Sequence, residues 1–130
     1  MHATQILAEF GAGFRQQPIA PDLTHHAKRA VIDWYASVFP GLKTDPVRLL
    51  EATLAEDLDQ GAARLVLGRR AKARTAALIN GTAAHAAEVD DSFREAMYHP
   101  GAATIAAALA AGQEVEANGA EFLRAVIVGY

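Results

Sequence analysis

The sequence predicts an all-α fold in which residues 1–130 form part of a single helical domain, with at most one short strand. Hydrophobic residues make up 52% of the chain and are mostly alanine, which favours helices and disfavours strands. Aromatic residues reach only 7%, which indicates a core of many small, close contacts. Several segments also repeat apolar residues at helical spacing behind a helix-start signal.

The first half of the chain is expected to form three helices. Residues 4–14 carry apolar side chains at three- and four-residue spacing, which is typical of a short amphipathic helix. A second helix is expected to begin at Pro21 and to stop at the Phe-Pro-Gly sequence of 39–41. The Asp-Pro pair at 45–46 gives a third start signal, and apolar residues on one face extend this helix towards Gly61.

The middle of the chain contains the candidate strand. Residues 63–67 are apolar and lie between Gly61 and Gly68, so they are expected to form a β-strand or an extended connector. Four basic residues follow, and we expect them to form a solvated face because charged residues are rarely buried. They are Arg69, Arg70, Lys72 and Arg74.

The second half is expected to add three more helices. Residues 75–90 are rich in alanine and should be helical, with a loop over 91–99. A helix is expected over 100–112, where a proline opens it and a glycine breaks it. The last helix, 118–130, begins with asparagine followed three residues later by glutamate, which indicates a capping box.

The last helix stays apolar up to Tyr130 and lacks a C-terminal glycine cap. We therefore expect the chain to be an N-terminal piece of a larger fold, and a chain end docked on a neighbour is the alternative. Its apolar surface is then expected to be covered by self-association or by further sequence. The predicted contact residues are Trp34, Phe122, Val126, Ile127 and Tyr130.

Composition and charge argue against several classes of function. The net charge is -3 and no basic block is present, so nucleic acid is not an expected partner. No apolar run is long enough to span a membrane, and we expect a soluble, cytoplasmic protein. Cysteine is absent, which excludes disulfides, zinc–thiolate sites and cysteine-bound iron–sulfur clusters within this sequence. Any chemistry is expected to use side chains, or a metal bound through histidine and carboxylate.

The stretch from 80 to 101 carries the candidate chemistry. His85 and Glu88 are expected one turn apart on the same helix face, and Asp91 and Ser92 follow from that helix end. Acidic residues at a helix C-terminus are unfavourable by up to about 1 kcal/mol, which suggests a purpose for them. His99 precedes a proline at the start of the next helix, where backbone N–H groups attract anions.

Three interpretations of this cluster remain open from spacing alone. A histidine, several carboxylates and a hydroxyl beside a helix N-terminus have the composition of a proton-transfer site. Spacing alone favours a second interpretation, in which His85 is a core or capping histidine with solvated acids around it. A metal site formed by His85, Glu88, Asp91 and His99 is the third alternative, although no established ligand spacing is present.

The same stretch resembles a family signature. The sequence N-G-T-A-A-H-A-A-E-V-D-D-S over 80–92, followed by H-P-G at 99–101, is similar to the N-G-x-x-x-H-x-x-[DE]-x-D-D-[ST] … H-P signature of the MmgE/PrpD family. This family includes 2-methylcitrate dehydratase, cis-aconitate decarboxylase and iminodisuccinate epimerase. Residues 27–35 and 119–130 also resemble family segments, so the similarity spans nearly the whole chain but covers only the N-terminal part of a family member.

The resemblance implies the helical N-terminal portion of the family's large domain, usually in a homodimer. It also implies dehydration, decarboxylation or epimerisation of small polycarboxylates next to a carboxylate, without metal or organic cofactor. His99 is then expected to be a general acid/base or a substrate-carboxylate contact, and Glu88, with Asp91, the second carboxylate. Ser92 is expected to donate a hydrogen bond.

Substrate binding is assigned to Arg94, the nearby arginine that can meet a carboxylate, and to His85, which is expected to orient the loop. Two functions follow from the sequence. The first is the N-terminal part of a PrpD-type lyase or epimerase, incomplete by itself. The second is a truncated, non-catalytic helical module for oligomerisation or binding.

Overall fold

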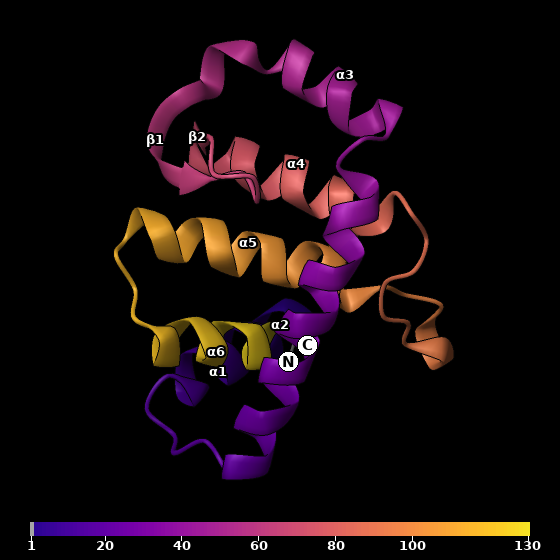
Figure 1. The fold of residues 1–130 in the computed structure, drawn as a ribbon. Helices are drawn as coiled ribbons and strands as arrows, with labels where there is room; N and C mark the ends of the chain where they lie inside the picture. The colour runs from indigo at the N-terminus through magenta and orange to yellow at the C-terminus, as the bar shows by residue number, and fades with distance from the viewer. Residues whose placement is uncertain (1) are drawn as a thin grey trace.

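The computed structural model describes residues 2–130, which form six α-helices and one small antiparallel sheet. α4, α5 and α6 lie one beneath another, and the long α2 runs across their ends (Figure 1). The predicted all-α class is confirmed. The helices are α1 (Ala3–Phe14), α2 (Pro21–Gly41), α3 (Asp45–Thr53), α4 (Ala73–His85), α5 (Pro100–Glu114) and α6 (Gly119–Gly129).

The sheet differs from the expected single strand over 63–67. β1 (Leu58–Arg64) pairs with the short β2 (Arg70–Ala71), so there are two strands and the first begins earlier than predicted. The expected continuation of α3 to Gly61 was also wrong, because α3 ends at Thr53. Gly61 has a φ of 73°, and a Cβ there would lie 2.8 Å from the Ala71 carbonyl oxygen. Glycine therefore permits the close approach of the two strands.

The basic residues beside the sheet are not simply a solvated face. Asp57, whose side chain is 8% exposed, accepts hydrogen bonds from Lys72 at 2.8 Å, Arg74 at 3.0 Å and Thr75 at 2.7 Å. These bonds hold the pKa of the Asp57 carboxyl well below its ordinary value of 3.8, and the bond from Lys72 has the largest effect. Asp57 thereby fixes the start of β1 to the start of α4.

The core is formed where α2, α4, α5 and α6 meet. Its largest buried apolar side chains are Trp34, Val38, Ile79, Ile105 and Val126. Small residues bring the helix backbones close together, as expected from the alanine content. The helices therefore hold the two ends of the 86–99 loop at fixed positions.

The predicted contact residues are only partly exposed. Trp34 and Val126 are buried within the chain's own core, so the expectation that they contact a partner was wrong. Phe122 and Ile127 are partly buried against the same core, and Tyr130 is half-exposed. The apolar side chains of α1 are the more exposed group, with Leu7 at 70%. Within residues 2–130, no helix is long and apolar enough to cross a membrane.

Candidate active site

The end of α4 shapes the candidate site. α4 stops at His85, and the chain then turns so that Glu88 takes a left-handed conformation with a φ of 53°. The expectation that the helix continues to Asp90, with His85 and Glu88 on one face, was therefore wrong. The physical reason is that Asp90 folds back onto the last residue of α4. Glu88 is exposed and lies outside the resulting cluster.

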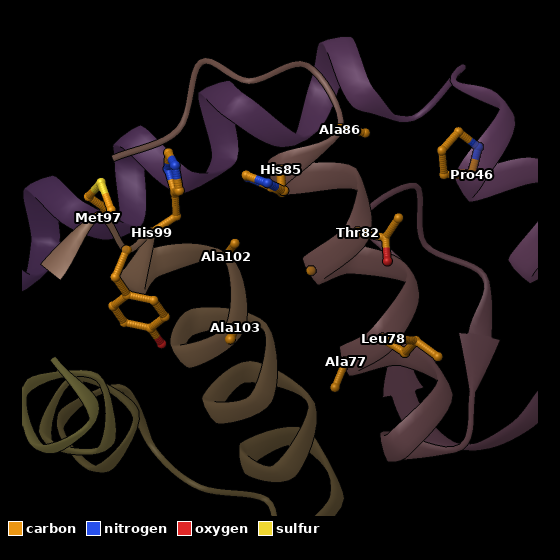
Figure 2. Close-up of a pocket in the computed structure, with 12 residues that line it drawn as sticks. Pro46, Ala77, Leu78, Thr82, His85, Ala86, Met97, His99, Ala102 and Ala103 are labelled. Carbon is orange, nitrogen blue, oxygen red and sulfur yellow. The ribbon is translucent and has the colours of Figure 1, made fainter. Parts of the chain in front are cut away.

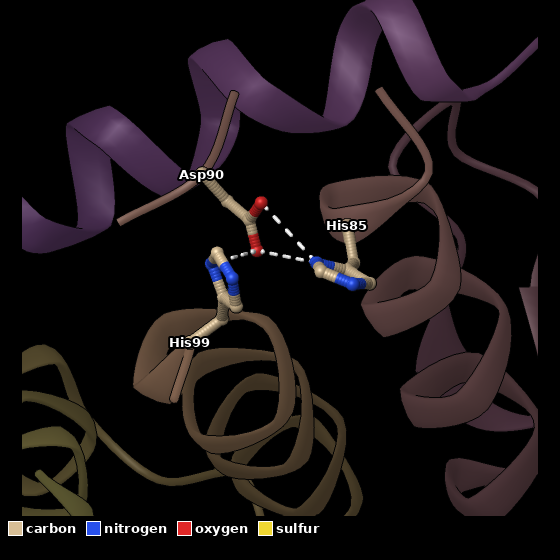
Figure 3. A group of neighbouring side chains, drawn as sticks. All are labelled: His85, Asp90 and His99. Carbon is tan, nitrogen blue, oxygen red and sulfur yellow. Dashed lines mark hydrogen bonds and ion pairs between the residues drawn. The ribbon is translucent and has the colours of Figure 1, made fainter. Parts of the chain in front are cut away.

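Asp90 is the centre of this cluster (Figure 3). Its side chain is only 2% exposed, and its carboxylate oxygens lie 3.0 and 3.2 Å from His85 Nδ1. The same carboxylate lies 3.6 Å from His99 Nδ1, at the N-cap of α5. The two imidazole rings are 4.8 Å apart between centroids. A buried carboxylate thus joins the end of α4 to the start of α5.

The hydrogen bonds define which ring nitrogens carry protons. His99 Nδ1 lies 2.8 Å from the backbone carbonyl oxygen of Asp91, which can only accept, so this nitrogen donates. His85 Nδ1 faces a carboxylate and donates in the same way. In neutral imidazoles, Nε2 then keeps its lone pair. The arrangement gives both histidines a fixed orientation and a nitrogen able to exchange a proton.

Asp91 is held by both of its carboxylate oxygens. Oδ1 accepts a hydrogen bond from the Gly101 backbone N–H at 3.1 Å, and Oδ2 accepts one from the Tyr130 hydroxyl at 3.0 Å. A Cβ at Gly101 would lie 2.6 Å from Asp91 Oδ1, so glycine leaves room for this contact. Burial, together with the bond to Asp91, raises the pKa of the Tyr130 phenol well above its ordinary value. Asp91 therefore ties the loop to α5 and α6.

The remaining predicted site residues lie on the exposed part of the loop. Ser92 Oγ is 3.5 Å from His99 Nδ1, so it is near the cluster but at the limit of a hydrogen bond. Arg94 opens a short 3-10 turn over Arg94–Ala96 and is exposed. This turn lies inside a small loop closed by backbone pairing of Phe93 with Tyr98. Arg94 is thus part of an exposed turn and not of the histidine cluster.

A cavity of about 720 Å³ opens between α4 and α5, beside the two histidines (Figure 2). Its volume falls within the range of small-molecule sites, about 300–1,000 Å³. His85 and His99 lie along one side, and the walls are largely apolar, with Leu78 from α4 and Ala102 from α5 among them. Within residues 2–130, its lining includes neither arginine nor lysine.

The first part of the signature has a structural role. Asn80 is buried, its Oδ1 accepts from the Val66 N–H at 3.0 Å, and its Nδ2 donates to the Arg64 carbonyl at 3.0 Å. A Cβ at Gly81 would lie 2.9 Å from the Ala102 carbonyl oxygen. Asn80 thus anchors the sheet connection to α4, and Gly81 allows α4 and α5 to approach beside the cavity.

Asp90 is not among the site residues expected from the sequence. The available signal was its position five residues after His85, which lets a carboxylate fold back on a histidine only if the helix ends between them. Tyr130, which binds Asp91 across 39 positions of sequence, had no local signal.

The geometry defines a helical domain with a histidine–aspartate cluster at the mouth of a cavity. Comparison with protein families matches residues 5–130 to the MmgE/PrpD N-terminal domain. The chain therefore belongs to the MmgE/PrpD family and corresponds to its N-terminal domain. Searches of curated proteins and of solved structures gave no match.

Proposed function

We propose that this chain is the N-terminal part of a cofactor-independent lyase or epimerase that moves a proton next to a carboxylate of a small di- or tricarboxylic acid. The observation that carries the proposal is the pair of histidines at the cavity, each with Nδ1 engaged and Nε2 available. Histidine exchanges protons near neutral pH more readily than other side chains.

His99 is the proposed general acid/base. Its Nδ1–H bond to the Asp91 carbonyl fixes the ring, and the same contact directs Nε2 away from the backbone. His85, which Asp90 holds in place, contacts the substrate beside it. Removal of a proton next to a carboxylate requires one positioned base, and loss of the β-substituent requires its conjugate acid. A second carboxylate role for Glu88 would require the 86–92 turn to rearrange, because Glu88 lies outside the cluster.

Substrate carboxylates need cationic partners. The cavity walls within residues 2–130 do not supply arginine or lysine, and the Gly101 N–H at the start of α5 is already bound to Asp91. We propose that Arg94 supplies one counter-charge from the exposed side of the loop and that the rest of the complete protein supplies others. A homodimer is part of this proposal.

The alternative function is a helical oligomerisation or binding module without catalysis. It is favoured by the exposed apolar side chains of α1, where Ile6, Leu7 and Phe10 are 51, 70 and 54% exposed. In this alternative the histidine cluster has only a structural role.

The test is turnover by the protein translated from the full reading frame. cis-Aconitate and 2-methylcitrate are incubated with it, and products are followed by proton NMR. Conversion of either, with loss of activity in His99→Gln, supports the proposal. A purified 130-residue chain that forms a stable oligomer in sedimentation, together with a complete protein inert towards a panel of di- and tricarboxylates, supports the alternative.

A further inference from the structure

The charge balance around Asp90 is unusual. Its carboxylate is almost fully buried, and its partners are His85 and His99. No arginine or lysine within residues 2–130 pairs with it. Buried carboxylates are normally paired with a cation or coordinate a metal, because an isolated buried charge is costly. Two imidazoles and a buried carboxylate gathered beside a cavity are also the kind of side chains that coordinate a metal ion.

From this geometry we propose that His85, Asp90 and His99 form a binding site for a divalent transition-metal ion, foremost Zn²⁺, and that the ion inhibits the site. One ring nitrogen of each histidine and a carboxylate oxygen of Asp90 lie within 4.8 Å of one another. In a tetrahedral zinc site with bonds of about 2.0–2.2 Å, ligand atoms lie about 3.4 Å apart. The cluster therefore closes around an ion by side-chain movements of about 1 Å.

The donor set selects the class of ion. Two imidazoles and one carboxylate suit Zn²⁺, Co²⁺ and Ni²⁺, whereas Mg²⁺ and Ca²⁺ prefer oxygen ligands throughout. Three protein ligands leave a fourth position for water or an anion. His85 and His99 have side chains 52 and 38% exposed, so an ion can reach them without unfolding the chain.

The inhibitory effect rests on the proposed function, whereas ion binding does not. Binding of Zn²⁺ to Nδ1 of a neutral imidazole displaces the ring proton to Nε2, so no net proton is lost. The hydrogen bond from His99 to the Asp91 carbonyl opens, and Nε2 changes from an acceptor to an N–H group. The nitrogen that is proposed to take the substrate proton is then unavailable.

Isothermal titration of the purified protein with ZnCl₂ tests the site directly. We expect saturable binding of one ion per chain, and we expect His85→Gln to weaken it at least about 10-fold. His85 is the primary variant because it is half-exposed. Asp90→Asn is a second variant, and circular dichroism checks that it folds. The matched control changes the adjacent exposed histidines of α2, His25→Gln and His26→Gln, and should leave binding unchanged.

Three outcomes would overturn the proposal: no saturable Zn²⁺ binding, equal binding by His85→Gln and the parent, or equal binding of Mg²⁺. Co²⁺ provides a second readout, because a bound four- or five-coordinate ion absorbs visible light more strongly than the hydrated ion. If the complete enzyme turns over substrate yet does not bind Zn²⁺, only the metal site fails. If Zn²⁺ binds and no polycarboxylate is converted, the proposed function fails together with the inhibition that rests on it, and the metal site stands.

Discussion

Gly41 is the position where the packing of this domain is most sensitive to one methyl group. It ends α2, and a Cβ built there would lie 1.9 Å from the carbonyl oxygen of Ala83 and 2.7 Å from its carbonyl carbon. These atoms belong to the backbone of α4, so they cannot rotate away. Gly41→Ala therefore forces α2 and α4 apart by more than 1 Å. The contacted residue, Ala83, lies two residues before His85.

The expected loss of stability follows from two opposing effects. Overpacking a tight interior contact typically costs about 1–3 kcal/mol, and this contact is at the severe end. Alanine regains up to about 1 kcal/mol over glycine in a helix. We expect a net loss of about 2 kcal/mol in the free energy of unfolding, or about 8 °C in Tm for a chain of this length.

Urea denaturation followed by circular dichroism measures this change. Gly13→Ala is the matched control, because Gly13 lies in α1 and a Cβ there meets nothing within 4 Å. The control should be neutral or slightly stabilising. A Gly41→Ala protein whose unfolding free energy lies within about 0.5 kcal/mol of the parent, the range of neutral surface substitutions, would refute the close α2–α4 contact.

Two further predictions concern the buried polar residues. Asn80→Ala leaves the Val66 N–H and the Arg64 carbonyl without their partner, and should cost about 2–4 kcal/mol in urea denaturation; a loss below about 1 kcal/mol would contradict the role assigned to Asn80. The pKa of Asp57 is depressed in the folded protein, so its stabilisation is present above pH 3.8 and is lost as the pH falls below that value. Asp57→Asn should lower stability at pH 7 and make Tm fall less steeply between about pH 4 and 2. A variant whose Tm falls as steeply as that of the parent over this pH range would contradict the role assigned to Asp57.

Local signals in the sequence were sufficient for most helices. The start of α6 was predicted because a capping box is formed within four residues: Asn118 Oδ1 accepts from the Glu121 N–H at 3.1 Å, and Glu121 returns a bond to the Asn118 N–H. The small sheet was misplaced because its anchor is not local. Asp57 is separated from Lys72 and Thr75 by 15 and 18 residues, and nothing near Asp57 identifies those partners.

The candidate site was also predictable from the sequence only in part. His85 and His99 were identified from their pattern and from the family resemblance, and the structure brings them together. Asp90 was overlooked because its importance comes from burial between two helices, which spacing does not reveal. The end of α4 was predicted too late because alanine-rich sequence favours continuing the helix. The turn at Glu88 depends on a tertiary contact.

We propose that His99 exchanges a proton with a carboxylate substrate while Asp91 and Asp90 hold its ring. The most direct test of this proposal is kcat of the complete protein and of its His99→Gln variant, with Tm measured on both. Loss of a positioned acid/base typically lowers the rate about 10²–10⁴-fold. We predict a fall of that order with Tm nearly unchanged, because His99 is 38% exposed and lies at a helix N-cap. A His99→Gln protein with near-full turnover would contradict the account.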